Sequence, residues 1–169
     1  MSSTTRATKA LEQACAKFTV HHYDYDPGAD RVGLQAAEAL GEVPARVLKT
    51  LMTKVDGKPA CVVVPSDREV SMKKLAAALG GKAAAMMPPA EAERLTGYKV
   101  GGISPFGQMK RVPVAVEAAV LEHALVYLNG GDDLTAVISR VEAANGTIIM
   151  PKMSIGENGF VAMFADTEG

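Results

Sequence analysis

The dipeptide Asp56-Gly57 lies between two runs of apolar and β-branched residues, and it constrains the fold more than any other feature. The run VLKTLMTKV precedes it, and PACVVVP follows it after Lys58. Asp-Gly readily adopts the positive φ angles of a two-residue hairpin turn, whose twist matches that of the flanking strands. The sequence therefore predicts an antiparallel β-hairpin.

Helices and strands are interspersed along the rest of the chain. Ser71 is expected to cap a helix, and Gly41 and Gly97 are expected to end two others. The expected helices cover residues 4–18, 32–40, 72–79, 89–96 and 118–122, and the expected further strands cover residues 20–25, 82–87, 112–116 and 124–128. Together with the hairpin, this order predicts an α+β fold.

The composition bounds the class of protein. A chain of 169 residues with 48% hydrophobic and 22% charged residues fits one globular domain. No apolar run approaches the roughly 20 residues that span a bilayer, and no secretory signal is visible, so a cytoplasmic location is expected. Cys15 and Cys61 form neither a redox motif nor a disulfide framework. A net charge of −1 excludes a strongly basic surface, so any contact with nucleic acid must be local.

Lys49 lies inside the first strand of the predicted hairpin. Strand alternation places it on the same face as Val47 and Leu51, which are apolar. Such a lysine is either an edge cation whose stem lies along the sheet or a functional charge in a pocket.

A second candidate segment is TGYKVGGISPFGQMKR, residues 96–111. Gly101 and Gly102 lack a Cβ, so their amides could approach a ligand oxygen closely, although a strand bulge or a simple turn would also use them. The segment matches neither the G-x-S-x-G nucleophile motif nor a nucleotide-binding glycine motif.

Taken together, HHYDYD, VLKTLM, TGYKVGGISPFGQMKRVP and ALVYLNGG resemble the YbaK/EbsC family of aminoacyl-tRNA deacylases, which are related to the editing domain of bacterial prolyl-tRNA synthetases. The resemblance covers residues 1–131. It implies a mixed, strongly curved sheet like a partial barrel, flanked by helices. It also implies hydrolytic clearing of misacylated tRNA in trans, chiefly Cys-tRNA(Pro), near prolyl-tRNA synthetase and without a cofactor.

The family's essential lysine matches Lys49, which would stabilise the reacting ester together with the Gly101-Gly102 amides. As a hypothesis, the substrate's own thiol attacks the ester carbonyl. The residues expected to bind substrate are Tyr23, Thr50, Gly101, Gly102, Ile103, Ser104, Pro105 and Asn129. The candidates for contact with tRNA phosphates are Lys99, Lys110 and Arg111, which would otherwise form a solvated rim.

Residues 132–169 depart from this pattern. Leu134, Val137, Ile138 and Val141 have helical spacing, and TIIMP and FVAMFAD are expected to form strands around Asn158-Gly159. This segment resembles the C-terminal part of a glyoxalase (vicinal oxygen chelate) protein. The sequence thus predicts an editing domain over residues 1–131 and an atypical helix and two strands after it. A natural fusion, a recombinant and an assembly error all fit this junction.

No metal site is expected. His21 and His22 would face opposite sides of a strand, and His123 lies apart from them. Two alternatives to the deacylase remain. One is an aminoacyl-tRNA binding module weakened by its replaced C-terminus, and the other is a metal-dependent dioxygenase or glyoxalase.

Overall fold

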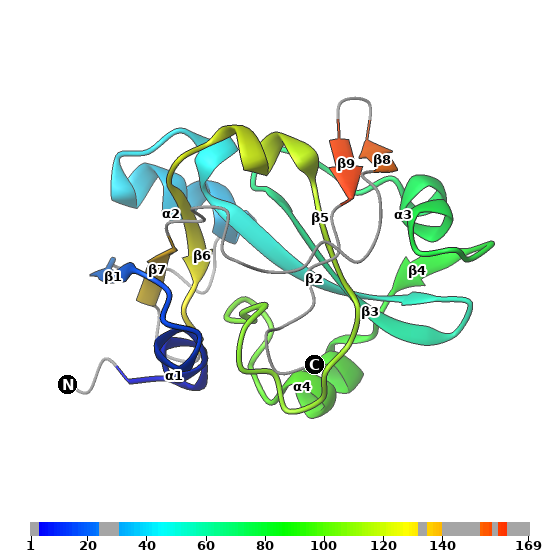
Figure 1. Ribbon diagram of the computed structural model, residues 1–169, viewed down its shortest axis with the longest axis horizontal. Helices are drawn as coiled ribbons and strands as arrows, with labels where there is room; N and C mark the ends of the chain where they lie inside the picture. Colours follow the sequence, from blue (N-terminus) through cyan, green and yellow to red (C-terminus); the bar gives the residue numbers. More distant parts are fainter. Residues whose placement is uncertain (1–3, 24–30, 132–134, 140–152, 157–158, 162–169) are drawn as a thin grey trace.

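A computed structural model describes residues 4–23, 31–131, 135–139, 153–156 and 159–161 (Figure 1). The α-helices are α1 (Arg6–Gln13), α2 (Val32–Leu40), α3 (Met72–Ala78) and α4 (Pro89–Thr96), and the short 3-10 helices are η1 (Pro44–Arg46) and η2 (Ala118–Glu122). The strands are β1 (Phe18–His22), β2 (Leu48–Val55), β3 (Lys58–Pro65), β4 (Ala84–Met86), β5 (Val114–Val116), β6 (Val126–Asn129), β7 (Thr135–Ser139), β8 (Met153–Gly156) and β9 (Gly159–Val161).

The predicted hairpin is confirmed. β2 and β3 pair antiparallel from Val55↔Lys58 to Leu48↔Pro65, and the turn residues Asp56 and Gly57 have φ of 48° and 78°. β4 adds antiparallel to β2, and β5 adds parallel to β3, which gives the order β4-β2-β3-β5. The sheet is therefore mixed, as expected for this fold class.

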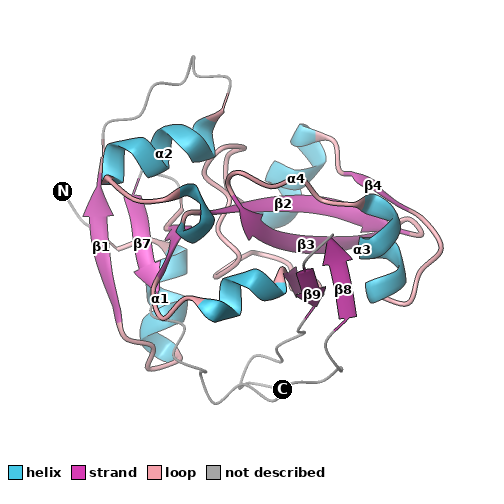
Figure 2. Cartoon of the chain, turned by 90° about the horizontal axis from the view of Figure 1, so that it is seen from above, coloured by secondary structure: helices cyan, strands magenta, loops and turns pink. Residues whose placement is uncertain are grey.

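A second sheet has the order β1-β7-β6, with antiparallel pairing throughout. Figures 1 and 2 place it at one end of the molecule, with the hairpin sheet at the other. A parallel bridge between Val47 and Tyr127 joins the two sheets. The strong curvature expected of a partial barrel stays a prediction.

The sequence predicted a helix after the Gly130-Gly131 turn. This prediction is wrong for Thr135–Ser139. These residues form β7, which pairs with β1 on one side and β6 on the other. Thr135, Val137 and Ile138 are β-branched, and the sheet offers them two strand partners, so the tertiary context overrides the helical spacing.

The other C-terminal predictions are tested only in part. β8 pairs antiparallel with β9. Phe160 and Val161 of β9 belong to the predicted FVAMFAD strand, whereas Gly159 was expected in the turn. The predicted strand TIIMP, the Asn158 turn position and residues 24 and 25 of the predicted strand 20–25 lie outside the described residues. The division of the chain at residue 131 stays a prediction.

Local signals set most helix ends correctly. Ser71 caps α3 by accepting a hydrogen bond from the Lys74 amide, and Gly41 and Gly97 end α2 and α4 with φ of 65° and 75°. Helix α1 is shorter than predicted and begins with a capping box between Thr5 and Thr8. Within the described part of the chain, every helix is too short or too polar to cross a bilayer.

The two faces of the β2–β3 hairpin bury different clusters. Leu48, Met52, Cys61 and Val63 pack on one face, together with residues of α4 and β6. Val55, Val62 and Val64 pack on the other face, against Leu75 of α3. The sequence, which is rich in alanine and methionine, predicts a small buried strand over residues 82–87. The strand forms as β4, but the expected burial is wrong, because β4 lies at the sheet edge and leaves Met86 51% exposed.

Candidate functional site

A cavity of about 500 Å³ lies where the two sheets meet. Its walls come from the start of α2, from β2, from the residues after β3, from the β4–α4 connection, from the loop of residues 97–107 (the glycine loop) and from β6. The lining residues are Tyr23, Arg31–Leu34, Ala36, Val47–Met52, Ser66–Glu69, Met86, Met87, Pro89, Ala92, Val100, Gly101, Ile103 and Tyr127–Asn129. A volume of this size suits a small ligand or the end of a larger one.

The cavity runs along an open edge of β2. Further along the strand, β4 pairs with Thr53–Val55, and the Met87 amide donates to the Met52 carbonyl at 3.0 Å. At the other end, Val47 bridges to Tyr127. Between these two points, the edge of β2 faces the cavity instead of another strand.

Thr50 lies in the middle of this open edge. In the hairpin, Thr50 lies opposite Val63, and Met52 lies opposite Cys61. The Val63 carbonyl accepts from the Glu117 amide, and the Cys61 amide donates to the Pro113 carbonyl. These bonds point away from β2, so Thr50 and Val63 are a pair that exchanges no hydrogen bonds. The backbone N–H and C=O of Thr50 therefore point away from β3, toward the cavity.

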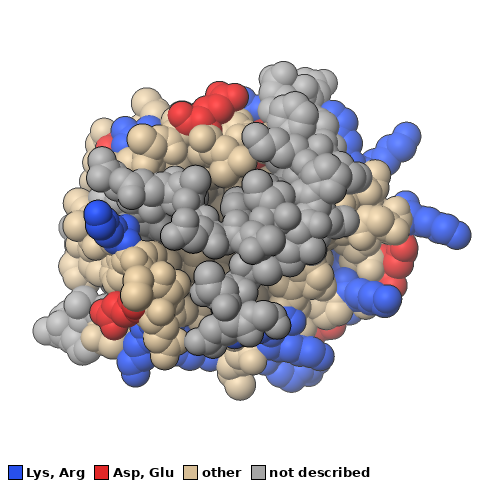
Figure 3. Space-filling view, viewed as in Figure 1, with Lys and Arg blue, Asp and Glu red and all other residues tan. Residues whose placement is uncertain are grey.

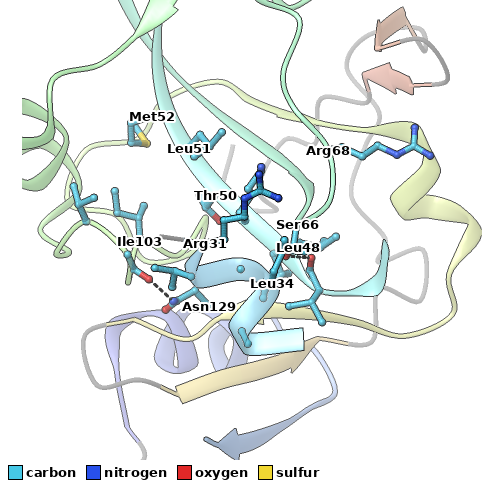
Figure 4. A pocket seen from close by; sticks show the side chains of 18 of the residues that line it. Arg31, Leu34, Leu48, Thr50, Leu51, Met52, Ser66, Arg68, Ile103 and Asn129 are labelled. Atoms are coloured by element: carbon cyan, nitrogen blue, oxygen red, sulfur yellow. Dashed lines mark hydrogen bonds between the residues drawn. The ribbon is translucent and has the colours of Figure 1, made fainter. Parts of the chain in front are cut away.

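Thr50 also carries an unpartnered side-chain oxygen. Its Oγ1 is buried and has no hydrogen-bond partner, and within the described chain its N–H and C=O have no backbone partner either. Figure 4 shows Leu48, Thr50 and Met52 along the strand, with Ile103 and Asn129 from neighbouring elements. A buried hydroxyl without a partner, on a residue whose backbone groups also face the cavity, indicates a binding position, because buried polar groups are normally hydrogen-bonded.

Lys49 is half-buried and lines the cavity next to Thr50. Val47 and Leu51 line it as well, in agreement with the predicted apolar surroundings. Among the described residues, Lys49 forms no ion pair, whereas Lys54 on the same strand pairs with Glu91 at 2.7 Å. The Lys49 ammonium is thus a positive charge available to a ligand.

The glycine loop, residues 97–107, is anchored by its first residues and by α1. Tyr98 is 1% exposed, and its hydroxyl donates to the Phe106 carbonyl at 2.7 Å, which ties the two ends of the loop together. The Arg6 guanidinium donates to the Gly97 carbonyl and lies 4.7 Å from the centre of the Tyr98 ring. The loop is therefore held in a fixed shape.

The structure brings part of the predicted substrate-binding set to the cavity. The members that line it are Tyr23, Thr50, Gly101, Ile103 and Asn129. Gly102, Ser104 and Pro105 do not line it. Ser104 is completely buried, and its hydroxyl accepts from the Phe106 amide at 3.3 Å, so it supports the turn of the loop.

The expected pair of amide donors is also only half available. The Gly102 amide donates to the Lys99 carbonyl at 2.9 Å, within a turn. Among the described residues, the Gly101 amide donates no hydrogen bond, so it remains a candidate donor. The turn that brings Gly101 to the cavity thus uses the Gly102 amide for a hydrogen bond of its own.

Asn129 connects β6 to the glycine loop. Its side-chain nitrogen donates to the Gly101 carbonyl at 3.0 Å, and its side-chain oxygen accepts from the Gly131 amide at 2.9 Å. Asn129 therefore lines the cavity and also fixes the position of Gly101.

The three candidates for phosphate contact lie on exposed chain around the loop. Lys99 pairs with Glu93 at 3.1 Å, and Lys110 and Arg111 follow the loop. In the view of Figure 3, basic side chains gather mainly on the side where Figure 1 places the hairpin, α3 and α4.

Several lining residues were not predicted. Ser66–Glu69 follow β3 directly, and the hairpin register, which sets Pro65 opposite Leu48, could have placed Ser66 beside Val47 at the start of β2. Arg68 pairs with Glu117 at 3.1 Å, and burial raises the pKa of the Glu117 carboxyl above its usual range. No sequence signal pointed to the start of α2 or to Met86 and Met87.

In the part of the chain that the structure describes, no group of three or more His, Cys, Asp or Glu side chains is placed to hold a metal ion.

Comparison with known proteins identifies the family. The model of the aminoacyl-tRNA editing domain matches residues 26–144. EbsC of Enterococcus faecalis, named as a proposed Cys-tRNA(Pro)/Cys-tRNA(Cys) deacylase, is 32% identical over 130 residues, or 75% of this chain and 77% of EbsC. A proline–tRNA ligase of Maridesulfovibrio salexigens is 28% identical over 132 residues, or 78% of this chain and 20% of that enzyme.

A solved structure, described as a proposed trans-editing enzyme for prolyl tRNA synthetase, has the same fold. Its TM-score is 0.69 at 22% identity, over 85% of this chain and 90% of that one. The matched segments include the hairpin, Lys49 and the glycine loop, which together build the cavity. The chain therefore belongs to the aminoacyl-tRNA editing domain family, with the YbaK-like fold that its motifs indicated.

Proposed function

We propose that this protein is a trans-acting deacylase that clears misacylated tRNA, chiefly Cys-tRNA(Pro). The family membership and the similarity to EbsC support a deacylase. The observation that carries the proposal is the Lys49 ammonium, which has no ionic partner among the described residues and lines a cavity beside the glycine loop. A fixed positive charge can stabilise the negative charge that develops as an ester carbonyl is attacked.

A separate hydrolytic site can remove errors that a single amino acid binding pocket cannot prevent. Cysteine and proline are similar in size, and a pocket rejects a small side chain only weakly when the difference is a few apolar contacts. The tRNA already holds the ester, so the deacylase needs to orient it and stabilise its charge. The cavity provides apolar walls, Lys49 and the Gly101 amide for these tasks.

The proposed reaction uses the thiol of the substrate. The cysteine sulfur, as thiolate, attacks the carbonyl carbon of its own ester and forms a carbon–sulfur bond. The bond from that carbon to the ribose oxygen then breaks, and the oxygen takes up a proton. The products are a cysteine thiolactone and free tRNA, and water later opens the thiolactone. Lys49 stabilises the carbonyl oxygen during the attack, so no nucleophile of the protein is required.

The test is amino acid release from Cys-tRNA(Pro), Ala-tRNA(Pro) and Pro-tRNA(Pro) by the wild type and by Lys49→Ala. Loss of the charge should lower kcat/KM for the cysteinyl ester about 100- to 1000-fold, the effect of removing one electrostatic stabiliser. Lys54→Ala is the matched control, because Lys54 lies on the same strand but pairs with Glu91 outside the cavity. Lys54→Ala should retain nearly full activity.

Three results would contradict the proposal or a part of it. Equal turnover by the wild type and Lys49→Ala would show that Lys49 takes no part in the reaction. Retention of tRNA without ester loss by the wild type would favour the aminoacyl-tRNA binding module instead. Cleavage of alanyl and seryl esters as fast as cysteinyl esters would leave a deacylase but refute the thiol route.

The proposal includes partners and a place of action. Lys99, Lys110 and Arg111 are the proposed contacts to tRNA phosphates, and prolyl-tRNA synthetase is the proposed source of the substrate. The reaction would take place in the cytoplasm, where tRNA is charged. Dependence of tRNA affinity on salt, compared between the wild type and Lys110→Ala, tests the first point.

A further inference from the structure

We propose that the open edge of β2 binds the aminoacyl group as if it were one residue of an added antiparallel strand, paired with Thr50. This inference rests on the proposed function and names the atoms that recognise the substrate. The backbone C=O of Thr50 accepts a hydrogen bond from the α-amino group of the substrate. The backbone N–H of Thr50 donates to the ester carbonyl.

The chemistry of an aminoacyl ester matches this edge. In an antiparallel pair, two opposite residues exchange two hydrogen bonds, one from each N–H to the other C=O. An aminoacyl ester carries an amine donor and a carbonyl acceptor on either side of a single carbon, as one residue of a strand does. Thr50 has both complementary groups directed at the cavity and without a backbone partner in the described chain.

The length of the open edge restricts the occupant. It lies between the Val47–Tyr127 bridge and the Met52–Met87 hydrogen bond. At about 3.3 Å per residue this gap is shorter than an ordinary strand of five to six residues. A peptide strand would therefore collide with β6 or with the β4–α4 connection, whereas a single aminoacyl unit fits.

The direction of this pairing agrees with the position of Lys49. The N–H of Thr50 lies on the side of Lys49, and its C=O lies on the side of Leu51. A substrate paired antiparallel thus places its ester carbonyl next to Lys49 and its amine toward Leu51. The ribose then continues toward Leu48, where the first residues of α2 and Tyr127 line the cavity.

The same pairing assigns a place to the substrate side chain. Opposite residues of an antiparallel pair carry their side chains on the same face. The side chain of an L-amino acid would therefore lie on the face of Thr50, Leu48 and Met52, beside the unpartnered Thr50 Oγ1. This hydroxyl can bond to a thiol or hydroxyl, so the site suits a small side chain with one such group.

A backbone substitution tests the proposal. The reference variant, Thr50→Val, lacks the side-chain oxygen and keeps the backbone N–H. The second variant carries 2-hydroxyisovaleric acid, the hydroxy-acid analogue of valine, at position 50, so an ester oxygen also replaces the backbone N–H. The hydroxy-acid variant should hydrolyse Cys-tRNA(Pro) about 100-fold more slowly than Thr50→Val, because it lacks one donor to the reacting carbonyl. Equal rates would overturn the inference and leave the proposed function intact.

A matched substrate tests the amine. The 3-mercaptopropionyl ester of tRNA(Pro) keeps the thiol and lacks the α-amino group. Each enzymatic rate is divided by the spontaneous rate in the same buffer, because the amine also activates the ester. The corrected kcat/KM should be at least about tenfold lower than for the cysteinyl ester. If the corrected kcat/KM is the same for both esters, the Thr50 carbonyl does not recognise the α-amino group.

Hydrogen exchange provides a readout that does not depend on turnover. In the free protein, the Thr50 amide should exchange much faster than the amides of Lys49 and Leu51, which bond to β3. The stable amide analogue 3′-(L-alanylamino)-3′-deoxyadenosine should slow the Thr50 amide selectively. Binding of this analogue without protection of Thr50 would refute the pairing alone. Absence of both binding and turnover would refute the proposed function together with it.

Discussion

Replacement of Gly107 by alanine should destabilise the protein strongly, although Gly107 lies outside the cavity. Its φ is +63°, and an added Cβ would lie 2.5 Å from the Arg6 carbonyl oxygen and 2.6 Å from the Arg6 carbonyl carbon. The left-handed conformation costs a non-glycine residue about 1–2 kcal/mol. Forcing α1 away from the loop adds about 1–3 kcal/mol. The free energy of unfolding should therefore fall by about 2–5 kcal/mol.

The control is Gly102→Ala, in the same loop. Gly102 has no left-handed φ, and its added Cβ would lie 3.5 Å from the Lys99 carbonyl oxygen, an ordinary contact. Urea unfolding should show a change below about 1 kcal/mol for this variant, and thermal unfolding should show a Tm lower by about 5–15 °C for Gly107→Ala. If the two variants unfold within about 0.5 kcal/mol of each other, the packing of the loop on α1 is not what fixes its shape.

Two further predictions concern titratable groups. Because burial raises the pKa of Glu117, the folded state binds its proton more tightly than the unfolded state, and stability falls as pH rises through that range. Glu117→Gln should therefore gain stability relative to the wild type as pH rises above the ordinary glutamate pKa of 4.5 in urea titrations, and a constant difference would contradict this. Burial raises the pKa of the Cys61 thiol to about 12, whereas Cys15 is exposed, so a thiol reagent at neutral pH should label only Cys15 until urea is added.

The sequence predicted those parts of the fold that depend on local chemistry. Asp56-Gly57 set both the turn and the register of the hairpin, because two positive φ angles are needed at these positions. Gly41 and Gly97 ended their helices for the same reason, since both adopt the left-handed conformation at a helix C-terminus.

The failure at Thr135–Ser139 has a non-local cause. Val137 and Ile138 fit one face of a helix, but adjacent apolar residues also suit a strand that is paired on both sides. The partners that decide between the two are β1 and β6, and β1 lies at the other end of the chain. Periodicity within a short window cannot detect such a partner.

The sequence indicated only part of the candidate site, because the rest depends on contacts that a local motif does not contain. Lys49, Thr50 and Gly101 carry the motif and line the cavity. The roles of Gly102 and Ser104 depend on hydrogen bonds inside the loop, which the motif does not encode. The open edge of β2 results from where β4 and β6 stop pairing, so only the assembled sheets show it.

The pairing of β1 with β7 joins position 22 to position 135 and has a consequence for biosynthesis. Translation at about 5–20 residues per second leaves the first strand waiting about 6–23 s for its partner. Such long-range contacts also slow the folding of a completed chain. Apart from the single bridge between Val47 and Tyr127, β6 pairs with β7 among the described strands, so the wall of the cavity at Tyr127–Asn129 is completed late. A nascent chain that already contains Lys49 and the glycine loop should therefore be inactive until β7 has left the ribosome.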